Sequence, residues 1–366
     1  MTQASAAVLR QPDGRFSIET VELDELRRDE VLVRNEASGI CHTDLLARER
    51  VPLPTVLGHE GAGVVEAVGA AVTGVRVGDR VVISYPWCGV CDHCDTGRPY
   101  LCAHHMQLAF SGARLDGSRS IKLGDRPISG AFFQQSSFAT RCIAPERSVV
   151  PVRADLPSRL GAAIPCGVQT GAGAVLNSLQ VSASQGLAVF GVGAVGLSAI
   201  LAGRLVGAFP LIAIDVLPDR LALARELGAS HALDARAGSV AGQIRDIARG
   251  GVEFTLETSG NEQALEDAIA SLASGGACGM VIAPHLGKKY PFSPSEVFVR
   301  AARLTGIIQG SAVPRQFLRK LLELHERGRF PFDSMVKYYD FSAINEAIAD
   351  TLAGRTIKPV LEMVGA

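Results

Sequence analysis

The stretch 187–215, LAVFGVGAVGLSAILAGRLVGAFPLIAID, determines the fold predicted for this chain. It opens with an apolar run, 187–190, which is typical of a short buried strand. Three glycines follow in G-x-G-x-x-G spacing: Gly191, Gly193 and Gly196. An apolar, alanine-rich segment then predicts a helix, and a second apolar run ends on Asp215. Strand, tight turn, helix and strand in this order predict a dinucleotide-binding unit rather than an isolated glycine-rich helix start.

Each part of this motif has a physical role. The first glycine permits the sharp turn, the second lets a pyrophosphate approach the backbone, and the third lets helix and strand pack closely. The N-terminus of the helix offers free N–H groups to the phosphates. Asp215 would accept hydrogen bonds from the adenosine ribose and repel a 2′-phosphate, which favours NAD over NADP. Arg220 either flanks that ribose or is a surface residue of the next helix.

Length and composition restrict the class of protein. A chain of 366 residues is long enough for two domains, each with its own core. The hydrophobic fraction of 47% and net charge of −1 describe an ordinary globular protein, with no indication of nucleic-acid or membrane partners. No apolar run reaches the length of a membrane span, and the first residues do not resemble a signal peptide. We therefore expect a cytoplasmic protein.

The distribution of periodic segments predicts two domains. From residue 187 onward, six strand patterns alternate with helical ones, which predicts an α/β domain with a six-stranded doubly wound parallel (Rossmann) sheet over 165–308. Residues 1–164 read as mainly antiparallel strands, with a long insertion, 103–135, whose middle reads as an irregular loop and whose end reads as a strand entry. Residues 309–366 contain a charged amphipathic helix and a last strand, 358–363, and we expect them to return to the first domain.

The eight cysteines favour metal binding or free thiols, because the chain is neither small nor visibly secreted. Four of them fall within fifteen residues, in a lobe spanning 85–105: Cys88, Cys91, Cys94 and Cys102. Four thiolates close a tetrahedron around Zn²⁺ and leave no open position, which predicts a structural zinc. An iron–sulfur cluster is the rival interpretation. The bacterial ferredoxin run puts its fourth cysteine after three residues, before a proline, whereas here the gap is seven and Ala103 follows.

Three further stretches hold residues that bind metals or carry protons. The segment 37–46, ASGICHTDLL, reads as a strand end running into a helix start, where Thr43 or Asp44 would serve as N-cap. His59 and Glu60 lie between glycines just before a strand. Cys166 lies among small residues and, taken alone, favours a small buried hydrophobe over a ligand.

Together these motifs resemble the zinc-containing medium-chain alcohol dehydrogenases, over nearly the full length of the chain. The motifs that carry the resemblance are CHTD (41–44), GHEGAG (58–63), the four-cysteine lobe, CGVQTGAG (166–173), GVGAVG (191–196) and Asp215. Within that family, CHTDL, FFQQSSFAT and CGVQTGAGAVLN are most similar to the benzyl (aryl) alcohol dehydrogenases. The resemblance implies a GroES-like catalytic domain beside the Rossmann domain.

The resemblance also implies a second, catalytic zinc in each subunit. It places three ligands on that ion: Cys41, His59 and Cys166. Three protein ligands leave a fourth position for water or an alcohol oxygen, and zinc there would acidify the alcohol so that its hydride can pass to nicotinamide. Glu60 would bind the ion transiently, and Asp44 would orient the imidazole. Thr43 would pass the alcohol proton onward.

The remaining implied contacts are to the cofactor. By resemblance, His42 lies near the pyrophosphate, Thr170 near the nicotinamide, and Val192 and Val195 against the apolar faces. Two positions depart from the family pattern. Leu46 stands where many relatives have a histidine that ends the proton relay. Leucine cannot accept a proton, so the sequence does not define the route by which the proton leaves. Lys358 stands where many have an arginine on the pyrophosphate, and lysine offers a point charge instead of a bidentate fork.

The sequence thus predicts an NAD-dependent zinc enzyme that reversibly oxidises primary aromatic or allylic alcohols to aldehydes. Alternatives are broad aliphatic or terpenoid alcohol oxidation on the same site, a non-catalytic zinc-stabilised NAD-binding protein and an iron–sulfur electron carrier. Placement along the chain suggests substrate-pocket residues: Ser84, Tyr85, Phe110, Phe132 and Phe133. The long 103–135 segment resembles that of dimeric relatives, so we expect a homodimer, rather than a tetramer, joined near 304–310.

Overall fold

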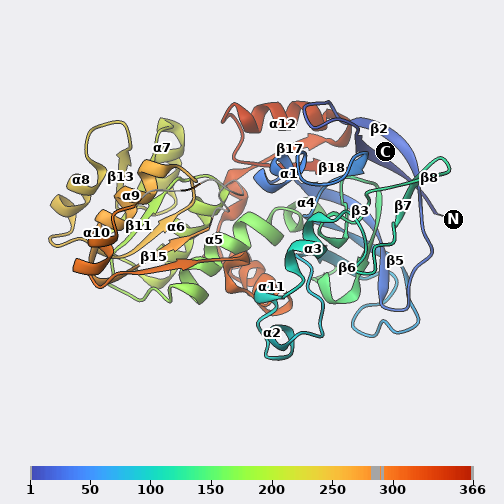
Figure 1. Ribbon diagram of the computed structural model, residues 1–366, viewed down its shortest axis with the longest axis horizontal. Helices are drawn as coiled ribbons and strands as arrows, with labels where there is room; N and C mark the ends of the chain where they lie inside the picture. The colour runs from blue at the N-terminus through green and yellow to red at the C-terminus, as the bar shows by residue number, and fades with distance from the viewer. Residues whose placement is uncertain (1, 282–288, 290–291, 364–366) are drawn as a thin grey trace. The chain divides into compact units, whose positions relative to one another are not determined.

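The computed structural model describes residues 2–281, 289 and 292–363 of the chain. They form two compact units (Figure 1). The first comprises Met1–Cys166, Val313–Lys320 and Asp333–Ala366, and the second comprises Gly167–Ala312 and Leu321–Phe332. The first boundary lies two residues after the one expected at 164. The segment 321–332 was expected in the first domain but packs in the second unit, where Phe330 and Phe332 are fully buried.

The second unit is built on one parallel sheet, with strand order β13-β12-β11-β14-β15-β16. Its strands are β11 (Leu187–Phe190), β12 (Leu211–Asp215), β13 (His231–Asp234), β14 (Val252–Glu257), β15 (Leu272–Met280) and β16 (Arg303–Gly306). The chain leaves β11 toward one edge and returns beside it as β14. Ligands of such sheets bind where the strand order reverses, and the glycine-rich turn follows β11 at that point.

The alternation of side chains along the strands explains how helices cover both faces of this sheet. On one face, Gly203 of α6 lies where a Cβ would meet Leu187 and Leu211. On the other face, Phe190 and Ile212 share a core with α8 and α9. The α-helices of this unit are α5 (Gln169–Gly173), α6 (Ala194–Val206), α7 (Pro218–Glu226), α8 (Val240–Ile247), α9 (Glu262–Ala270) and α10 (Pro294–Val299). The predicted Rossmann fold is therefore confirmed.

One strand of this sheet differs from its predicted bounds. We expected a strand over 279–283, whereas β15 begins at Leu272 and ends at Met280. Residues 282 and 283 lie outside the described part of the chain. The added N-terminal part of this strand contains the run ASGGA (273–277), whose serine and glycines are typical of a loop. Parallel pairing with β14, with an irregularity between Val252 and Phe254, overrides that tendency.

The first unit contains two sheets of mainly antiparallel strands, with orders β4-β1-β2-β7-β8 and β10-β6-β5-β3-β18-β17; β9 also pairs with β3. The strands are β1 (Thr2–Leu9), β2 (Ser17–Leu23), β3 (Glu30–Gly39), β4 (Thr55–Val56), β5 (Gly61–Val68), β6 (Arg80–Ile83), β7 (Ile121–Leu123), β8 (Arg126–Ile128), β9 (Arg141–Pro145), β10 (Val149–Pro151), β17 (Val336–Asp340) and β18 (Lys358–Glu362). Its α-helices are α1 (His42–Ala47), α2 (Asp92–Asp95), α3 (His105–Phe110), α4 (Ser158–Gly161) and α12 (Ile344–Leu352), and α11 (Pro314–Glu326) begins in it.

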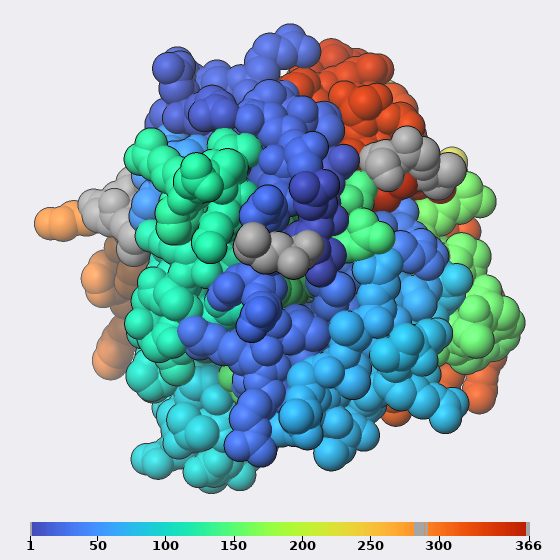
Figure 2. Space-filling model, turned by 90° about the vertical axis from the view of Figure 1, so that its right-hand side faces the viewer, coloured from blue at the N-terminus to red at the C-terminus, as the bar shows by residue number. Residues whose placement is uncertain are grey.

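The last strand returns to this unit as predicted, since β18 pairs antiparallel with β3. The expectation of an irregular loop in the middle of 103–135 was wrong, because this part of the chain contains α3 and the β7–β8 hairpin. Figure 2 shows the blue N-terminal strands bordered by the teal-green segment that holds this hairpin. Buried Arg114 anchors the segment through Glu30, with Nε 2.6 Å from Oε1. No helix in the described ranges is long and apolar enough to cross a membrane.

Candidate active site and metal centres

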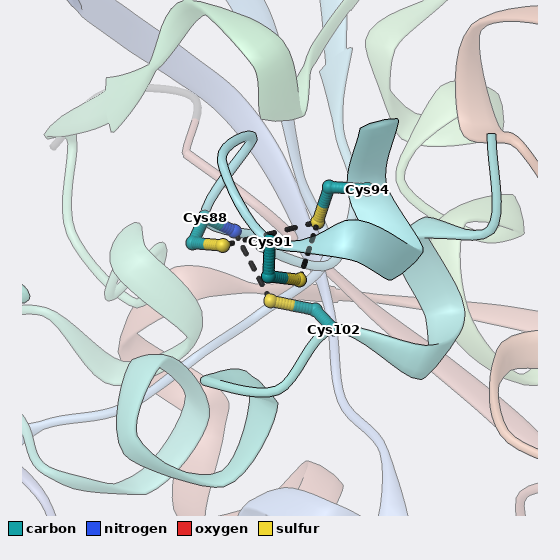
Figure 3. Close-up of side chains that lie close together, drawn as sticks. All are labelled: Cys88, Cys91, Cys94 and Cys102. Carbon is teal, nitrogen blue, oxygen red and sulfur yellow. Dashed lines mark hydrogen bonds between the residues drawn. The ribbon is translucent and has the colours of Figure 1, made fainter. Parts of the chain in front are cut away.

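The four cysteines of the predicted structural site converge on one point (Figure 3). Their sulfur atoms all lie within 4.8 Å of one another. The Sγ of Cys94 is 3.5 Å from that of Cys91 and 3.9 Å from that of Cys88. A tetrahedron of sulfurs at the usual Zn–S bond length has edges of about 3.8 Å. The spacing therefore fits a four-coordinate metal and leaves no position for a substrate.

Backbone amides around this cluster donate to its sulfur atoms. The N–H of Cys88 donates to Cys102 Sγ at 3.2 Å, and the N–H of Val90 donates to Cys88 Sγ at 3.5 Å. The Ala103 amide is the chief cause that lowers the pKa of Cys91 to about 6. A deprotonated thiol is the form that binds a metal. Burial has the opposite effect on two of the other thiols: it raises the pKa of Cys94 to about 12 and also raises the pKa of Cys102.

The second group of metal-binding side chains lies in the first unit and joins distant parts of the chain. Cys41 follows β3, His59 and Glu60 precede β5, and Cys166 lies in the π-helical turn Ile164–Val168. One ligand atom from each of these four residues lies within 4.8 Å of the others. The two sulfurs are 3.7 Å apart. The structure therefore assembles all three expected ligands, together with Glu60, at one place.

Asp44 holds two of the ligand segments together. Its Oδ2 accepts from the Cys41 N–H at 2.8 Å, while its Oδ1 accepts from the Gly58 N–H at 3.2 Å and lies 2.9 Å from His59 Nδ1. The prediction that Thr43 or Asp44 is the N-cap was wrong. Cys41 is the N-cap residue of α1, and Asp44 is at the third helical position and bonds back to it.

The geometry of His59 provides the test of whether a metal fits. The imidazole is 1% exposed, and its Nδ1 is occupied by Asp44. Its Nε2 is buried without a hydrogen-bond partner in the described chain. Buried polar atoms normally have a partner, so this nitrogen, beside two sulfurs, fits a metal ligand. Phe133 packs on the ring with centroids 4.6 Å apart, and Phe132 meets it edge-on.

Charge within this group is shared. The hydrogen bond with Cys166 lowers the pKa of Cys41 well below its ordinary value, and the same contact raises the pKa of Cys166. Burial opposes a positive charge on His59, but the Asp44 carboxylate outweighs burial and raises the pKa of His59 well above its usual range. Burial raises the pKa of Glu60 to about 7. A cation among these atoms would relieve the repulsion that such close anionic groups create.

Lys358, which the resemblance places at the cofactor pyrophosphate, lies beside this group of metal-binding side chains. It is 2% exposed, and its ammonium group contacts Glu60 Oε2. Gly39 makes room for that carboxylate, since a Cβ at this position would collide with Glu60 Oε2 and with the Ala162 carbonyl. Lys358 and Gly39 are thus part of the surroundings of the metal group, and no sequence motif indicated this role for Gly39.

Sequence reasoning also missed Gln135. Its Oε1 accepts from the Gly61 N–H at 3.0 Å, and its Nε2 donates to the His59 carbonyl at 3.0 Å. The side chain is fully buried and therefore fixes the backbone on both sides of Glu60. A glutamine in the run FFQQSS shows no periodicity that would indicate this role. Its contacts to a segment over seventy residues away arise only from the fold.

The glycine-rich turn of the second unit has the geometry that its motif predicts. Gly191 has φ +85°, a conformation that favours glycine, and its carbonyl accepts from Thr258 Oγ1 at 2.6 Å. A Cβ on Gly196 would collide with that same carbonyl. At Gly193, in contrast, the one atom among the described residues that a Cβ would meet, apart from its chain neighbours, is Arg220 Nη1 at 3.9 Å. The second glycine therefore faces open space, as a turn that admits a pyrophosphate requires.

The predicted acid lies at the end of β12. Asp215 Oδ2 accepts from the Val192 N–H at 2.8 Å, and Oδ1 accepts from the amides of Val216 and Leu217 at 2.8 and 3.0 Å. These amides fix the carboxylate next to the glycine-rich turn. Arg220 Nη1 lies 4.0 Å from Asp215 Oδ2, so it accompanies the acid rather than pointing away from it.

The other expected cofactor residues occupy varied environments. Val192 is buried and Val195 is half-buried at the start of α6. Thr170 is buried in α5, and Gly171 brings that helix against the Val195 carbonyl. His42 is exposed at the start of α1 in the first unit. Of the suggested pocket residues, Phe110 is half-buried and the other four are buried: Ser84, Tyr85, Phe132 and Phe133.

Comparison with known proteins gives consistent matches along the chain. The family models "Alcohol dehydrogenase GroES-like domain" and "Zinc-binding dehydrogenase" match residues 27–154 and 194–327. A geraniol dehydrogenase of Castellaniella defragrans is 44% identical over 98% of this chain and 97% of its own. The crystal structure of a benzyl alcohol dehydrogenase from Acinetobacter calcoaceticus has a TM-score of 0.96 at 39% identity, covering both chains fully. An alcohol dehydrogenase zinc-binding domain protein from Burkholderia ambifaria has a TM-score of 0.96 at 45% identity, covering 99% of each chain.

Proposed function

Because this chain belongs to the zinc-containing medium-chain alcohol dehydrogenases, we propose that it reversibly oxidises primary aromatic or allylic alcohols to aldehydes, with NAD as hydride acceptor. One observation carries the proposal. Two sulfurs, one carboxylate oxygen and a ring nitrogen of His59 lie within 4.8 Å of one another, and His59 Nε2 has no partner in the described chain. A non-catalytic relative has no need of such a group beside the closed four-cysteine site.

The chain's own residues suit two zinc ions in each subunit. We assign a structural ion to the four-cysteine lobe and a catalytic ion to Cys41, His59 and Cys166. At the catalytic position, zinc supplies Lewis acidity that makes an alcohol oxygen easier to deprotonate. Asp44 fixes the imidazole so that Nε2 points away from it, which is the usual arrangement for a metal-binding histidine.

The alcohol proton needs a polar route out of the site. Thr43 is half-buried, with Oγ1 3.8 Å from Cys41 Sγ, and a hydroxyl at this position can accept one proton while donating another. Leu46, one turn further along α1, has no atom that accepts a proton. We therefore propose that the proton leaves Thr43 through the cofactor ribose or directly to water.

We propose NAD rather than NADP because of the fixed carboxylate at the end of β12. Asp215 is held by three backbone amides, so it cannot swing aside for a 2′-phosphate. Arg220 is the counter-argument, because arginine near the ribose accommodates that phosphate in NADP enzymes. Its position 4.0 Å from Asp215 supports a role as the partner of the acid.

The substrate class rests on aromatic surroundings and on similar proteins. Phe110, Phe132 and Phe133 form one cluster, with ring centroids 4.9 to 5.9 Å apart, and Phe132 and Phe133 contact the His59 ring. Flat, conjugated alcohols suit such surfaces, because aromatic rings pack edge-to-face or offset. Terpenoid alcohols are the second candidate, since a 44% identical relative is named geraniol dehydrogenase. Geraniol is itself allylic, so the two candidates overlap.

A substrate panel tests the proposal. We would measure kcat/KM for benzyl alcohol, cinnamyl alcohol, geraniol and hexanol with NAD and with NADP, following reduced cofactor by absorbance. We expect NAD and the three conjugated or allylic alcohols to be preferred by about tenfold or more over hexanol, because one matched apolar contact surface is worth about 1–3 kcal/mol. Preference for hexanol would contradict the substrate class. No reduced cofactor with any alcohol would support a non-catalytic protein.

We further propose that the subunits pair through the edge strand β16. Its residues are largely exposed, and Phe298 and Val299 of α10, just before this strand in sequence, are 85% and 77% exposed. Unpaired strand edges and adjoining apolar side chains favour association with a second copy. A dimer in light scattering is the expected result.

A further inference from the structure

Lys358 is a buried cation whose position is determined by the sheet. Its strand, β18, pairs antiparallel with β3, and the Ile40 N–H donates to the Pro359 carbonyl at 2.9 Å. This pairing brings Lys358 beside Cys41, the residue that follows Ile40. The side chain is 2% exposed, and its ammonium contacts Glu60 Oε2. Lysine is almost never fully buried unless it is paired, and the Glu60 carboxylate is the partner that compensates its charge.

Glu60 is restrained on one oxygen and unrestrained on the other. Its Oε2 lies between the Lys358 ammonium and the backbone at Gly39, where a side chain would collide with it. Its Oε1 is buried and lacks a hydrogen-bond partner among the described residues. One carboxylate oxygen of Glu60 belongs to the group that lies within 4.8 Å of the Cys41, His59 and Cys166 ligand atoms. The carboxylate thus has two possible partners, Lys358 and a metal ion.

The charges indicate what Lys358 does. A divalent ion on two thiolates is balanced, so Glu60 adds one negative charge and Lys358 neutralises it. A buried carboxylate without a partner is strongly unfavourable and moves toward any available cation. Without Lys358, the metal would be the cation nearest to Glu60. The lysine therefore competes with the metal for the carboxylate.

We propose that Lys358 is a positioning residue that holds Glu60 back from the metal and so keeps the fourth coordination position open for the alcohol. The inference rests on the proposed function, specifically on a metal held by Cys41, His59 and Cys166. It gives the lysine a role that does not depend on contact with the cofactor. The role needs the positive charge of Lys358 and the presence of Glu60, and both requirements can be tested separately.

The test uses protein loaded with Co²⁺, whose visible absorption reports its ligands, and adds imidazole as an external ligand. The closed four-cysteine site has no free position, so only the imidazole-dependent change in absorption is read. We expect Lys358→Met to weaken imidazole binding about tenfold or more, because Glu60 then occupies the position, and to slow metal loss to a chelator. Residues next to metal ligands typically change affinity or activity by about 10- to 100-fold. Lys358→Arg, which keeps the charge, should remain within about threefold of wild type. The matched control is Lys320→Met, which removes an exposed lysine from the same unit.

A second pair of variants tests dependence on Glu60. With the carboxylate removed, Lys358 has nothing to restrain, so Glu60→Ala and Glu60→Ala/Lys358→Met should bind imidazole equally. Circular dichroism establishes which variants fold. If Lys358→Met alone does not fold, the comparison within this pair still exposes the proposal to rejection. A difference between the pair of more than about fivefold overturns the proposal, as does a folded Lys358→Met that binds imidazole like wild type.

Failure of this inference is distinct from failure of the proposed function. If wild-type protein shows no imidazole-dependent change in cobalt absorption, the assignment of an open metal site is wrong. If wild type responds and Lys358→Met responds equally, the metal site stands and only the role of Lys358 is rejected.

Discussion

Replacing Gly193 by alanine should separate cofactor binding from folding. Its backbone, with φ −74° and ψ −162°, is accessible to alanine, and within the described ranges the nearest atom to the added Cβ, beyond the two chain neighbours, is Arg220 Nη1 at 3.9 Å. Gly193 is the N-cap of α6. Alanine is a poorer N-cap than glycine but restricts the unfolded chain, so the two effects should cancel to within about 1 kcal/mol. We expect a Tm change of less than about 4 °C.

The cost should appear in cofactor binding. The methyl group would occupy the space in which a pyrophosphate meets the backbone of the turn. Loss of one hydrogen bond to a charged group costs about 1.5–3 kcal/mol. This corresponds to an increase of about 10- to 100-fold in the Kd of NADH. The magnitude assumes that one amide contact is lost and the remaining contacts are kept.

The assay is NADH binding by fluorescence titration, combined with thermal unfolding of the same preparation. Gly196→Ala is the matched control, because its Cβ would collide with the Gly191 carbonyl within the protein itself. Overpacking of this kind typically costs about 1–3 kcal/mol, so this variant should lose stability as well as affinity. A Gly193→Ala variant that binds NADH within about twofold of wild type would refute the reasoning.

Three further outcomes follow from the same structure. Cys94→Ser should leave about one zinc per subunit by metal analysis and lower the Tm, because a structural site contributes folding energy directly; two retained zinc ions would contradict the assignment. The hydrogen bond from Tyr339, reinforced by neighbouring cations, lowers the pKa of Asp350 below its usual value, so its stabilising effect is present above the unfolded-state pKa and is lost as pH falls through the folded-state pKa. Denaturant titration should therefore give a higher free energy of unfolding for wild type than for Asp350→Asn at pH 7, and the two values should converge toward pH 2. A difference between them that grows in acid would contradict the expected direction. Phe298→Asp should shift light scattering from dimer to monomer, and an unchanged dimer would exclude this face.

The parts of the fold that sequence predicts best are those whose residues act locally. The glycine-rich turn needs a positive φ at Gly191 and a close approach at Gly196, and both requirements are visible as missing side chains in one short motif. The four-cysteine lobe is likewise local, since its ligands span fifteen residues. Strand and helix positions in the second unit follow from apolar periodicity, and they agree with the structure to within a few residues in most cases.

The parts that sequence cannot predict depend on distant pairings. Gln135 supports the backbone around Glu60 only because the fold places it there. The β7–β8 hairpin lacks strong periodicity, and it forms because β7 pairs with β2 and β8 pairs with β7. The contact of Lys358 with Glu60 follows from the pairing of β18 with β3, which joins segments more than three hundred residues apart, and no local pattern indicates it. Cys166, unremarkable by itself, becomes interpretable only beside Cys41, 3.7 Å away.

Metal content and activity of Cys166→Ser, measured beside wild type, test the central claim most directly. Wild type should hold two zinc ions per subunit and form NADH from NAD and benzyl alcohol. Cys166→Ser should retain the zinc ion of the four-cysteine lobe, lose most or all of the other, and form NADH at least about 100-fold more slowly, since a metal ligand is removed. A folded Cys166→Ser protein that keeps two zinc ions and wild-type turnover would contradict the assignment of the catalytic metal site.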